Sequence, residues 1–469
     1  MKNLRFALFL FVIIPASLLT VNSQSSKIIV GNWSGNLDVT SAKLEIIFKF
    51  STDGAGNPTA VMDVPMQGAK DIECSVDKAD NDSLVLSVPL IRGSFKGAFM
   101  NDTAIEGTWE QSGMKFPLLL AKTNTVTELK RPQTPVPPFP YHSVEVTYAN
   151  SLSGFKIAGT LTLPENPNNC PAVILISGSG ALDRDETIFE HKPFLVIADY
   201  LTRNGIAVLR VDDRGVGGSE GKTGEATSKD FAGDVLAGVN FLKTRKEINP
   251  AKTGLIGHSE GGLIAPLVAT KTNDIAFIVL LAGPGIAGEQ ILYEQGMLLG
   301  KAAGLSYDQA LQNKKMQETI FSILKTETDS AKRTDDLQRT MSNGMYNMLN
   351  DDQKTTVDNQ IKTMDNVWFK FFLQYDPYPT LVKLKCPALV LNGEKDLQVP
   401  AKENLAAIEK ALTEGGNKNF KTMELPGLNH LFQTCETGAI AEYAQIEETI
   451  SPMVLEIILD WISNYGIKN

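Results

Sequence analysis

The stretch that decides the fold is GLIGHSEGGLIAP, residues 254–266. A buried-strand pattern, TGLIG, leads into it and a helical pattern, EGGLIAPLVATK, follows, so Ser259 stands at the apex of a tight turn from strand to helix. Gly257 and Gly261 are required because side chains at these positions would collide as the backbone closes. The turn is therefore expected to lift the serine hydroxyl above the edge of a sheet.

Around this turn, apolar runs alternate with helical patterns almost to the end of the chain. The predicted strands are AVILISG (172–178), IAVLRVDD (206–213), TGLIGHS (253–259), IAFIVLLAG (275–283), PALVLNGE (387–394) and FKTMELPG (420–427). Unbroken apolar runs suit a mostly parallel sheet that helices cover on both faces, which predicts the α/β fold class. A further pair of strands is predicted ahead of them, within 144–165.

One segment between these strands has the sequence pattern of an amphipathic helix with a capped start. TSKDFAGDVLAGVNFLKTR (227–245) begins with a capping box. Its apolar residues share one helical stripe: Phe231, Val235, Leu236, Val239 and Leu242. The alternation breaks once, at about 285–380, where the pattern is helical and no strand is convincing. We expect a helical cap above the sheet there, and not a separate domain.

A serine at such an apex predicts a nucleophile, which needs a base within hydrogen-bond reach. The chain contains four histidines, so elimination is practical. His142 ends a proline-rich stretch, and His191 lies near the start of a predicted helix. His258 precedes the serine, where its side chain should point away from the hydroxyl. His430 alone follows the last predicted strand, at the edge where active sites of open α/β sheets form, and is the predicted base.

The acid that holds the histidine should lie between Ser259 and His430, because this architecture orders its triad Ser, Asp or Glu, His. Asp396, in LVLNGEKDLQVP (389–400), follows another buried strand. Glu394 is the nearby competitor. Asp396 repeats the strand-end position of the other two residues, so the predicted catalytic set is Ser259, Asp396 and His430.

Acyl transfer also requires hydrogen-bond donors for the oxyanion of the tetrahedral intermediate. One predicted donor is the backbone N–H of Glu260, directly after the nucleophile. The other should come from SGSGALDRDE (177–186), where we name Ser179 with Gly180 as the fallback. The G-x-G in this loop lacks the third glycine of a dinucleotide-binding fingerprint, which argues against a nucleotide cofactor.

Together these residues resemble the α/β-hydrolase superfamily over about 143–466. The motifs GHSEGG, VDDRGVGGSEG, NGEKDLQVP and PGLNH occur in the order that the superfamily has. SGSGALDRDE and GTLTLPEN are similar to secreted bacterial carboxylesterases related to the serine aminopeptidase and acyl hydrolase branch. The resemblance implies a mostly parallel eight-stranded sheet, a helical cap, and a serine hydrolase that cleaves carboxylic esters through an acyl-enzyme.

Two polar stretches are expected to support this site. The family's D-x-R-G-x-G-x-S pattern falls on residues 212–219, and we expect these to brace the turn beneath the active site. Asp183, Arg184 and Asp185 are expected to form an ion-pair cluster that orients the oxyanion loop.

The amino-terminal part of the chain is organised differently. Residues 1–23 have the charged start, the apolar run and the small-residue end of a secretory signal peptide, which predicts a secreted or periplasmic protein without membrane insertion after signal removal. Residues 24–128 alternate as an antiparallel β domain does, and its Trp33 and Trp109 are predicted core residues. Five prolines in 129–142 predict an extended linker, and 143–469 form the catalytic domain.

The β domain has three roles open to it: covering the mouth of the active site, forming a homodimer, or binding carbohydrate. The net charge of -10 and the lack of a basic block exclude nucleic acid as a partner. The four cysteines are too widely spaced for a metal site, and no metal or organic cofactor is expected. The expected partner is a small-molecule ester substrate.

Two other functions remain open. The first is a serine peptidase or aminopeptidase of the same fold, which would need a carboxylate of the cap to hold the amino group of its substrate. Glu289, Glu294 and Glu318 are among the candidates for that carboxylate. The second is an inactive, glycan-binding relative of the hydrolases.

Overall fold

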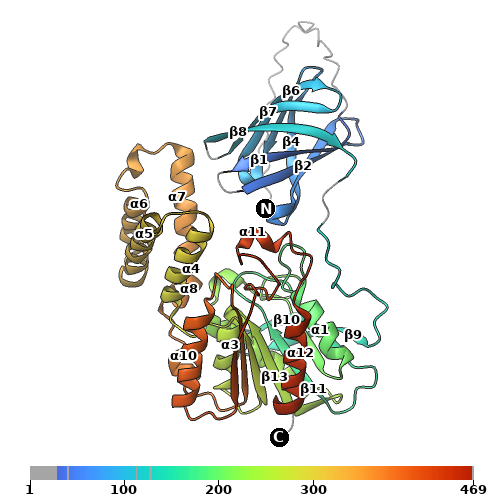
Figure 1. Cartoon of the computed structure of the whole chain (residues 1–469), viewed down its shortest axis with the longest axis vertical. Coiled ribbons are helices and arrows are strands. Elements are labelled where there is room, and N and C mark those ends of the chain that lie inside the picture. The colour runs from blue at the N-terminus through green and yellow to red at the C-terminus, as the bar shows by residue number, and fades with distance from the viewer. Residues whose placement is uncertain (1–28, 40–41, 112, 126–128, 467–469) are drawn as a thin grey trace, which may run out of the picture.

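The computed structural model describes residues 29–39, 42–111, 113–125 and 129–466 of the 469-residue chain. The predicted signal peptide, residues 1–23, lies outside the described residues. The chain folds into an N-terminal β barrel and a larger α/β unit, and the barrel is seated over one end of that unit (Figure 1).

The barrel is an antiparallel meander that closes by pairing its first strand with its last. Its strands are β1 (Gly31–Val39), β2 (Ala42–Thr52), β3 (Pro58–Val64), β4 (Ala69–Ala79), β5 (Ser83–Val88), β6 (Gly93–Asn101), β7 (Ala104–Gln111) and β8 (Met114–Thr123). Two short 3-10 turns, η1 (Pro65–Gln67) and η2 (Pro89–Ile91), join β3 to β4 and β5 to β6. Trp33 and Trp109 are buried in the interior, which confirms them as core residues.

The α/β unit is built on one eight-stranded sheet, in the order β16-β15-β14-β13-β11-β12-β10-β9. Its strands are β9 (His142–Asn150), β10 (Phe155–Leu163), β11 (Cys170–Ile176), β12 (Ala207–Val211), β13 (Ile248–His258), β14 (Phe277–Leu281), β15 (Ala388–Gly393) and β16 (Phe420–Leu425). The strands from β11 to β16 pair in parallel, whereas β10 pairs antiparallel with both β9 and β12. This mostly parallel sheet confirms the predicted fold class.

Helices cover both faces of the sheet. They are α1 (Pro193–Arg203), α2 (Ser228–Lys243), α3 (Glu260–Ala269), α10 (Ala401–Glu414) and α12 (Pro452–Trp461), with the short elements η3 (Thr223–Glu225), α11 (Ile440–Tyr443) and η5 (Ile462–Gly466). Ile174 of β11 packs in the core that contains side chains of α2, α3 and α10. Its neighbours Val173 and Leu175 pack in the core that contains side chains of α1 and α12. This alternation is why the strand is apolar throughout.

Helix α2 shows how local sequence sets an element. The backbone N–H of Thr227 donates to the Asp230 carboxylate at 2.8 Å, so the predicted capping box is present. On the predicted stripe, Val235, Val239 and Leu242 are buried against the sheet. The stripe therefore fixes which side of the helix faces the core.

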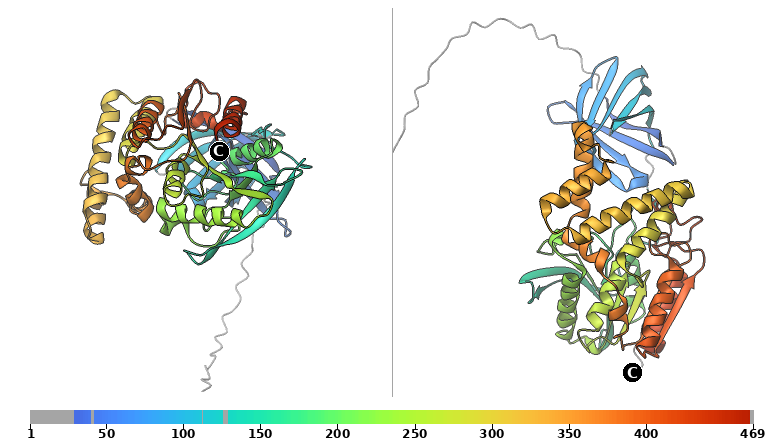
Figure 2. Two further views of the ribbon diagram at one scale, coloured as in Figure 1. Left: turned by 90° about the horizontal axis from the view of Figure 1, so that it is seen from below. Right: turned by 90° about the vertical axis from the view of Figure 1, so that its left-hand side faces the viewer.

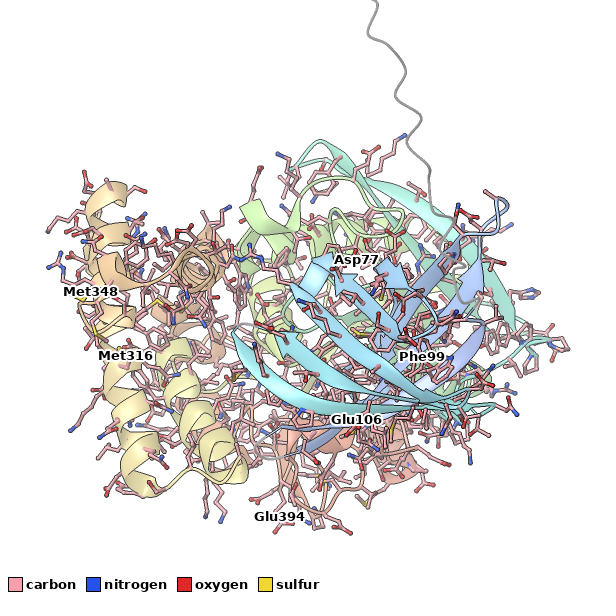
Figure 3. The ribbon with its side chains drawn as sticks, turned by 90° about the horizontal axis from the view of Figure 1, so that it is seen from above. Asp77, Phe99, Glu106, Met316, Met348 and Glu394 are labelled. Atoms are coloured by element: carbon pink, nitrogen blue, oxygen red, sulfur yellow. The ribbon has the colours of Figure 1, made fainter. Side chains whose placement is uncertain are left out.

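The cap lies between β14 and β15. It consists of α4 (Gly288–Ala302), α5 (Tyr307–Thr326), α6 (Ser330–Met341), η4 (Tyr346–Met348), α7 (Asp351–Met364), α8 (Val367–Gln374) and α9 (Tyr378–Leu381). Its helices share a small core of their own, and Figure 2 shows them rising from the sheet beside the barrel. Seen from above in Figure 3, Met316 and Met348 lie on the side of the cap away from the barrel. Among the described helices, none has the length and apolar character needed to cross a bilayer.

The proline-rich linker is bound along the surface of the α/β unit. Arg131 donates to the backbone carbonyls of Phe189, Ala444 and Ile446 at 2.7 to 3.1 Å. The Gln133 amide nitrogen donates to the Ile450 carbonyl at 2.8 Å. The linker is therefore anchored to the α/β unit at Arg131 and Gln133.

Candidate active site

Most of the predicted site residues line one cavity of about 560 Å³ at the carboxyl edge of the parallel strands. Ser259 and Glu260 come from the turn after β13, Ser179 from the loop after β11, and His430 from the loop after β16. Helices α4 and α8 of the cap and turn η1 of the barrel supply further walls. Three parts of the fold thus enclose a single site.

The backbone at Ser259 has φ 52° and ψ -118°, a conformation that residues other than glycine rarely adopt. Close packing holds it there. A Cβ atom at Gly257 would lie 2.0 Å from the carbonyl oxygen of Gly261, and one at Gly261 would lie 2.1 Å from that of Ile176. The predicted need for both glycines is confirmed.

His430 and Asp396 are brought together as a buried pair. His430 Nδ1 lies 2.8 Å from Asp396 Oδ2, and the Oδ1 atom accepts the backbone N–H groups of Gln398 and Val399, both at 2.8 Å. These bonds fix the carboxylate, which in turn favours a proton on Nδ1 and leaves Nε2 as the basic nitrogen. The competing Glu394 is exposed, accepts from the backbone N–H of Gly427, and lies at the edge of the molecule in Figure 3.

Two of the other histidines lie outside the cavity lining. His142 bonds the carbonyl of Glu165 at 3.0 Å near the surface. His191 is buried between Thr449 and the carbonyl of Tyr443, and its burial lowers its pKa to about 4. At neutral pH, His191 is therefore a neutral structural residue.

His258 makes a buried pair that the sequence did not predict. Its Nδ1 lies 3.0 Å from Glu186 Oε1, and its Nε2 lies 3.0 Å from the backbone carbonyl of His430. Burial alone would lower the pKa of His258, but the Glu186 carboxylate and the His430 carbonyl raise it above its ordinary value. Glu186 also accepts the backbone N–H of Gly178 at 2.7 Å, so the pair connects three loops of the site.

The residues of the two predicted oxyanion donors, Ser179 and Glu260, both line the cavity with Ser259. The amide of Gly178 is occupied by Glu186, which leaves Ser179 as the next amide of that loop. Among the described residues, no acceptor bonds the backbone N–H of Ser179 or of Glu260. Both groups are therefore available to a ligand oxygen.

The side chain of Glu260 is a second feature that the sequence did not predict. It is buried, and its Oε1 accepts from Ser228 Oγ at 2.5 Å and from Trp368 Nε1 of α8 at 2.8 Å. Its Oε2 is buried and meets the hydrogen-bond criterion with no other described residue. Burial raises the pKa of the carboxyl, and the nearby side chains of Ser228, Trp368 and Ser179 oppose that rise. A buried carboxylate beside Ser259 carries no local sequence signal, because the partners that hold it come from distant elements.

The polar support predicted beneath the site is present in part, because Asp183 accepts hydrogen bonds from Thr187 and makes no ion pair with another described residue, and the ion pairs of its neighbours run to other segments. Arg184 makes a two-pronged contact with Asp212, at 3.0 and 2.7 Å, and Arg214 Nε bonds Asp234 at 2.7 Å. Asp185 pairs with Arg210. These residues do not line the cavity, so they act on the site through the loops that they hold.

Comparison with known proteins places this chain among hydrolases. Residues 191–434, more than half of the chain, match the model of the family described as Serine aminopeptidase, S33. The chain is 26% identical to Esterase EstD of Thermotoga maritima over 73% of each sequence. Similar solved structures include the α/β hydrolase GrgF from Penicillium sp. sh18, at 17% identity and a TM-score of 0.45, covering 70% of this chain and 99% of that one.

Est1E from Butyrivibrio proteoclasticus is also similar, at 20% identity and a TM-score of 0.39 over 68% of this chain and 98% of its own. The family match begins after the barrel and the linker, and it spans the serine turn, the Asp396 loop and the His430 loop. With its mostly parallel sheet and its cap, the chain belongs to the serine aminopeptidase S33 family of α/β-hydrolases.

Proposed function

We propose that this protein is a serine esterase that cleaves small carboxylic esters through an acyl-enzyme on Ser259. The observation that carries the proposal is one cavity lined by a serine with strained backbone and by a histidine that a buried aspartate holds at 2.8 Å. The similarity to Esterase EstD supports an ester as the substrate.

In the proposed reaction, His430 Nε2 takes the proton of the Ser259 hydroxyl as the oxygen attacks the ester carbonyl. Asp396 stabilises the imidazolium that forms. The Ser179 and Glu260 amides donate to the oxyanion, and the alcohol leaves with the proton from His430. Water then attacks the acyl-enzyme with the same base, which releases the acid and restores the serine.

Aminopeptidase activity is the second candidate, and the Glu260 carboxylate favours it. The cap residues Glu289, Glu294 and Glu318 do not line the cavity, whereas Glu260 does. Its unpartnered Oε2 could accept the ammonium group of an aminoacyl substrate, which would compensate the cost of burying the charge. Under this alternative Glu260→Gln would reduce cleavage of aminoacyl p-nitroanilides far more than cleavage of uncharged esters.

The setting of the activity is also a proposal. The pattern of residues 1–23 supports export to the periplasm or the medium, and the acidic net charge supports small molecules over nucleic acid as partners. Fractionation of cells that express the full chain would test export. Retention of the mature enzyme in the cytoplasm with residues 1–23 uncleaved would contradict it.

The direct test compares the mature protein with Ser259→Ala on p-nitrophenyl esters from acetate to palmitate and on aminoacyl p-nitroanilides. We expect ester turnover that the substitution lowers by on the order of 10⁴-fold or more. Cleavage of the anilides alone would favour the aminopeptidase. Inactivity on both series, with intact folding, would favour the glycan-binding alternative.

A further inference from the structure

The barrel contributes to the cavity that holds Ser259. Gln67 and Gly68, at the end of turn η1, are among the lining residues. Figures 1 and 2 show the barrel seated over one end of the α/β unit, and Figure 1 shows α11 at that end. Gln67 is exposed and makes no hydrogen bond to another described residue, so its amide offers both a donor and an acceptor at the cavity.

The contact between η1 and the α/β unit is close. Gly68 ends the turn with φ +63°, and a Cβ atom there would lie 3.2 Å from Phe189 Cδ1 and 3.3 Å from Phe189 Cα. Glycine is therefore favoured here for two reasons: it adopts the left-handed backbone conformation, and it leaves room for the close approach of Phe189. A weaker ion pair, Lys70 to Glu190 at 3.6 Å, lies beside this contact.

The loop beneath η1 is held in an unusual conformation. Glu186, Phe189 and Glu190 all have positive φ, at 53°, 49° and 61°. Arg131 of the linker bonds the carbonyl of Phe189 at 2.7 Å, and Glu186 bonds His258 beside the serine. Strained residues persist where the surrounding structure fixes them, and they concentrate at functional sites. The loop thus connects the barrel contact to the centre of the site.

The second turn of the barrel, η2, does not share the contact that η1 makes with the cavity. Both turns join an odd strand of the meander to the next even strand, so both lie at the same end of the barrel. No residue of η2 lines the cavity, and its Leu90 is 79% exposed. The chain therefore provides a matched control position on the same barrel.

We propose that turn η1 is a specificity element of the active site, in which Gln67 contacts the end of the bound substrate and limits its length. The inference rests on the proposed ester hydrolysis. The Phe189 loop extends from the oxyanion loop toward the barrel, so a substrate group that follows this wall reaches Gln67. Short acyl groups end before it.

The experiment measures kcat/KM for p-nitrophenyl acetate, butyrate, octanoate and palmitate with wild type, Gln67→Trp, Gln67→Ala and Leu90→Trp. We expect Gln67→Trp to lower the octanoate-to-acetate ratio of kcat/KM by roughly tenfold, and Gln67→Ala to raise the palmitate-to-acetate ratio. Leu90→Trp should keep the wild-type ratios. Equal ratios in Gln67→Trp and Leu90→Trp would overturn the proposal.

A binding measurement separates this proposal from the proposed function. In the Ser259→Ala background, fluorescence titration gives Kd for p-nitrophenyl butyrate and octanoate with and without Gln67→Trp. If Gln67→Trp abolishes octanoate binding and retains butyrate binding, the result supports η1 as the element that limits substrate length. This outcome does not require that the wild type cleaves an ester, so it is independent of the proposed function. Unchanged Kd values, or no binding of either ester, would overturn it.

Discussion

Ser259 shows at the scale of one residue how packing holds a backbone conformation that is rarely adopted. Its backbone conformation costs on the order of 1–3 kcal/mol, which the packing of Gly257 and Gly261 around it must offset. In return the hydroxyl stands clear of the sheet, in the cavity that His430 also lines.

The Asp396 carboxylate is predicted to set the rate through His430. Asp396→Asn should lower kcat on the preferred ester by about 10⁴-fold, because an amide no longer favours the reactive tautomer or stabilises the imidazolium. Steady-state kinetics with circular dichroism to check folding would measure this. Glu394→Gln, at an exposed carboxylate nearby, should keep wild-type kcat, and an equal loss there would contradict the assignment.

His258 is predicted to make stability depend on pH. Its pKa in the folded state is raised above 6.5, so the stabilisation is complete below pH 6.5 and is lost as the pH rises through the higher folded-state value. Glu186, Asp396 and His430 are the titratable groups that face His258, and Asp213 and Glu260 lie near Glu186 or near each other.

Urea unfolding between pH 5.5 and 9 checks this prediction. Relative to His258→Asn, the wild type should lose free energy of unfolding over the upper part of that range. His142→Asn, at a surface position, should leave the pH profile of the wild type unchanged. Parallel profiles for wild type and His258→Asn would show that His258 is neutral in the folded state.

The strand-end positions of Ser259, Asp396 and His430 could be predicted from the sequence, because each residue follows a recognisable buried strand. It could not identify Glu186 or Gln67. Glu186 is defined by its contact with His258, and Gln67 by its place in the cavity lining, where the barrel meets the α/β unit. Neither contact leaves a pattern in the surrounding residues.

At the scale of elements, the turn from β13 to α3 shows how close packing restricts the residue type at a junction. Gly257→Ala should destabilise the protein by about 3 kcal/mol or more, since the new Cβ would meet the Gly261 carbonyl oxygen at 2.0 Å. Thermal unfolding and ester turnover should both show the loss. Gly224→Ala is the matched control, because a Cβ there meets nothing within 4 Å, and it should behave as wild type.

The strands of the sheet could be predicted closely, since burial on both faces makes them continuously apolar. The exception is β13, which begins at Ile248, five residues before the predicted start at 253. The added segment contains Asn249, Pro250 and Lys252, and it enters the sheet only because Ile248 pairs with Cys170 beyond a shift in register. The cap was predicted as one helical stretch, and its division into separate helices depends on their mutual packing.

At the scale of the whole molecule, the domain order could be predicted, but the seating of the barrel could not. Alternating patterns and prolines mark the two units and the segment between them. The contact of Gly68 with Phe189 depends on the shapes of the folded barrel and of the folded α/β unit where they meet. The linker takes part in the same arrangement through Arg131, which bonds two segments beside the cavity.

Arg131→Ala should lower the free energy of unfolding of the α/β unit by about 2 kcal/mol and raise KM, because carbonyls of Phe189, Ala444 and Ile446 lose a charged donor. Denaturant unfolding and steady-state kinetics would measure the two effects. Lys130→Ala removes only an exposed ion pair with Glu447 at 3.6 Å, and it should cost less than about 1 kcal/mol. A similar cost for both substitutions would contradict the role of Arg131.

The closure of the barrel has a consequence for how such a protein can be altered. Asn32 of β1 pairs with Thr123 of β8, so the chain enters and leaves the barrel at neighbouring points. A unit with adjacent ends can be exchanged as a cassette without rerouting the rest of the chain. Grafting a barrel that carries a different η1 turn would leave β13, α3 and the loops that hold Asp396 and His430 unaltered. Changes in the barrel could then alter the length of the pocket, while changes in the α/β unit alter the groups that react. The two kinds of change would fall in separate segments of the gene.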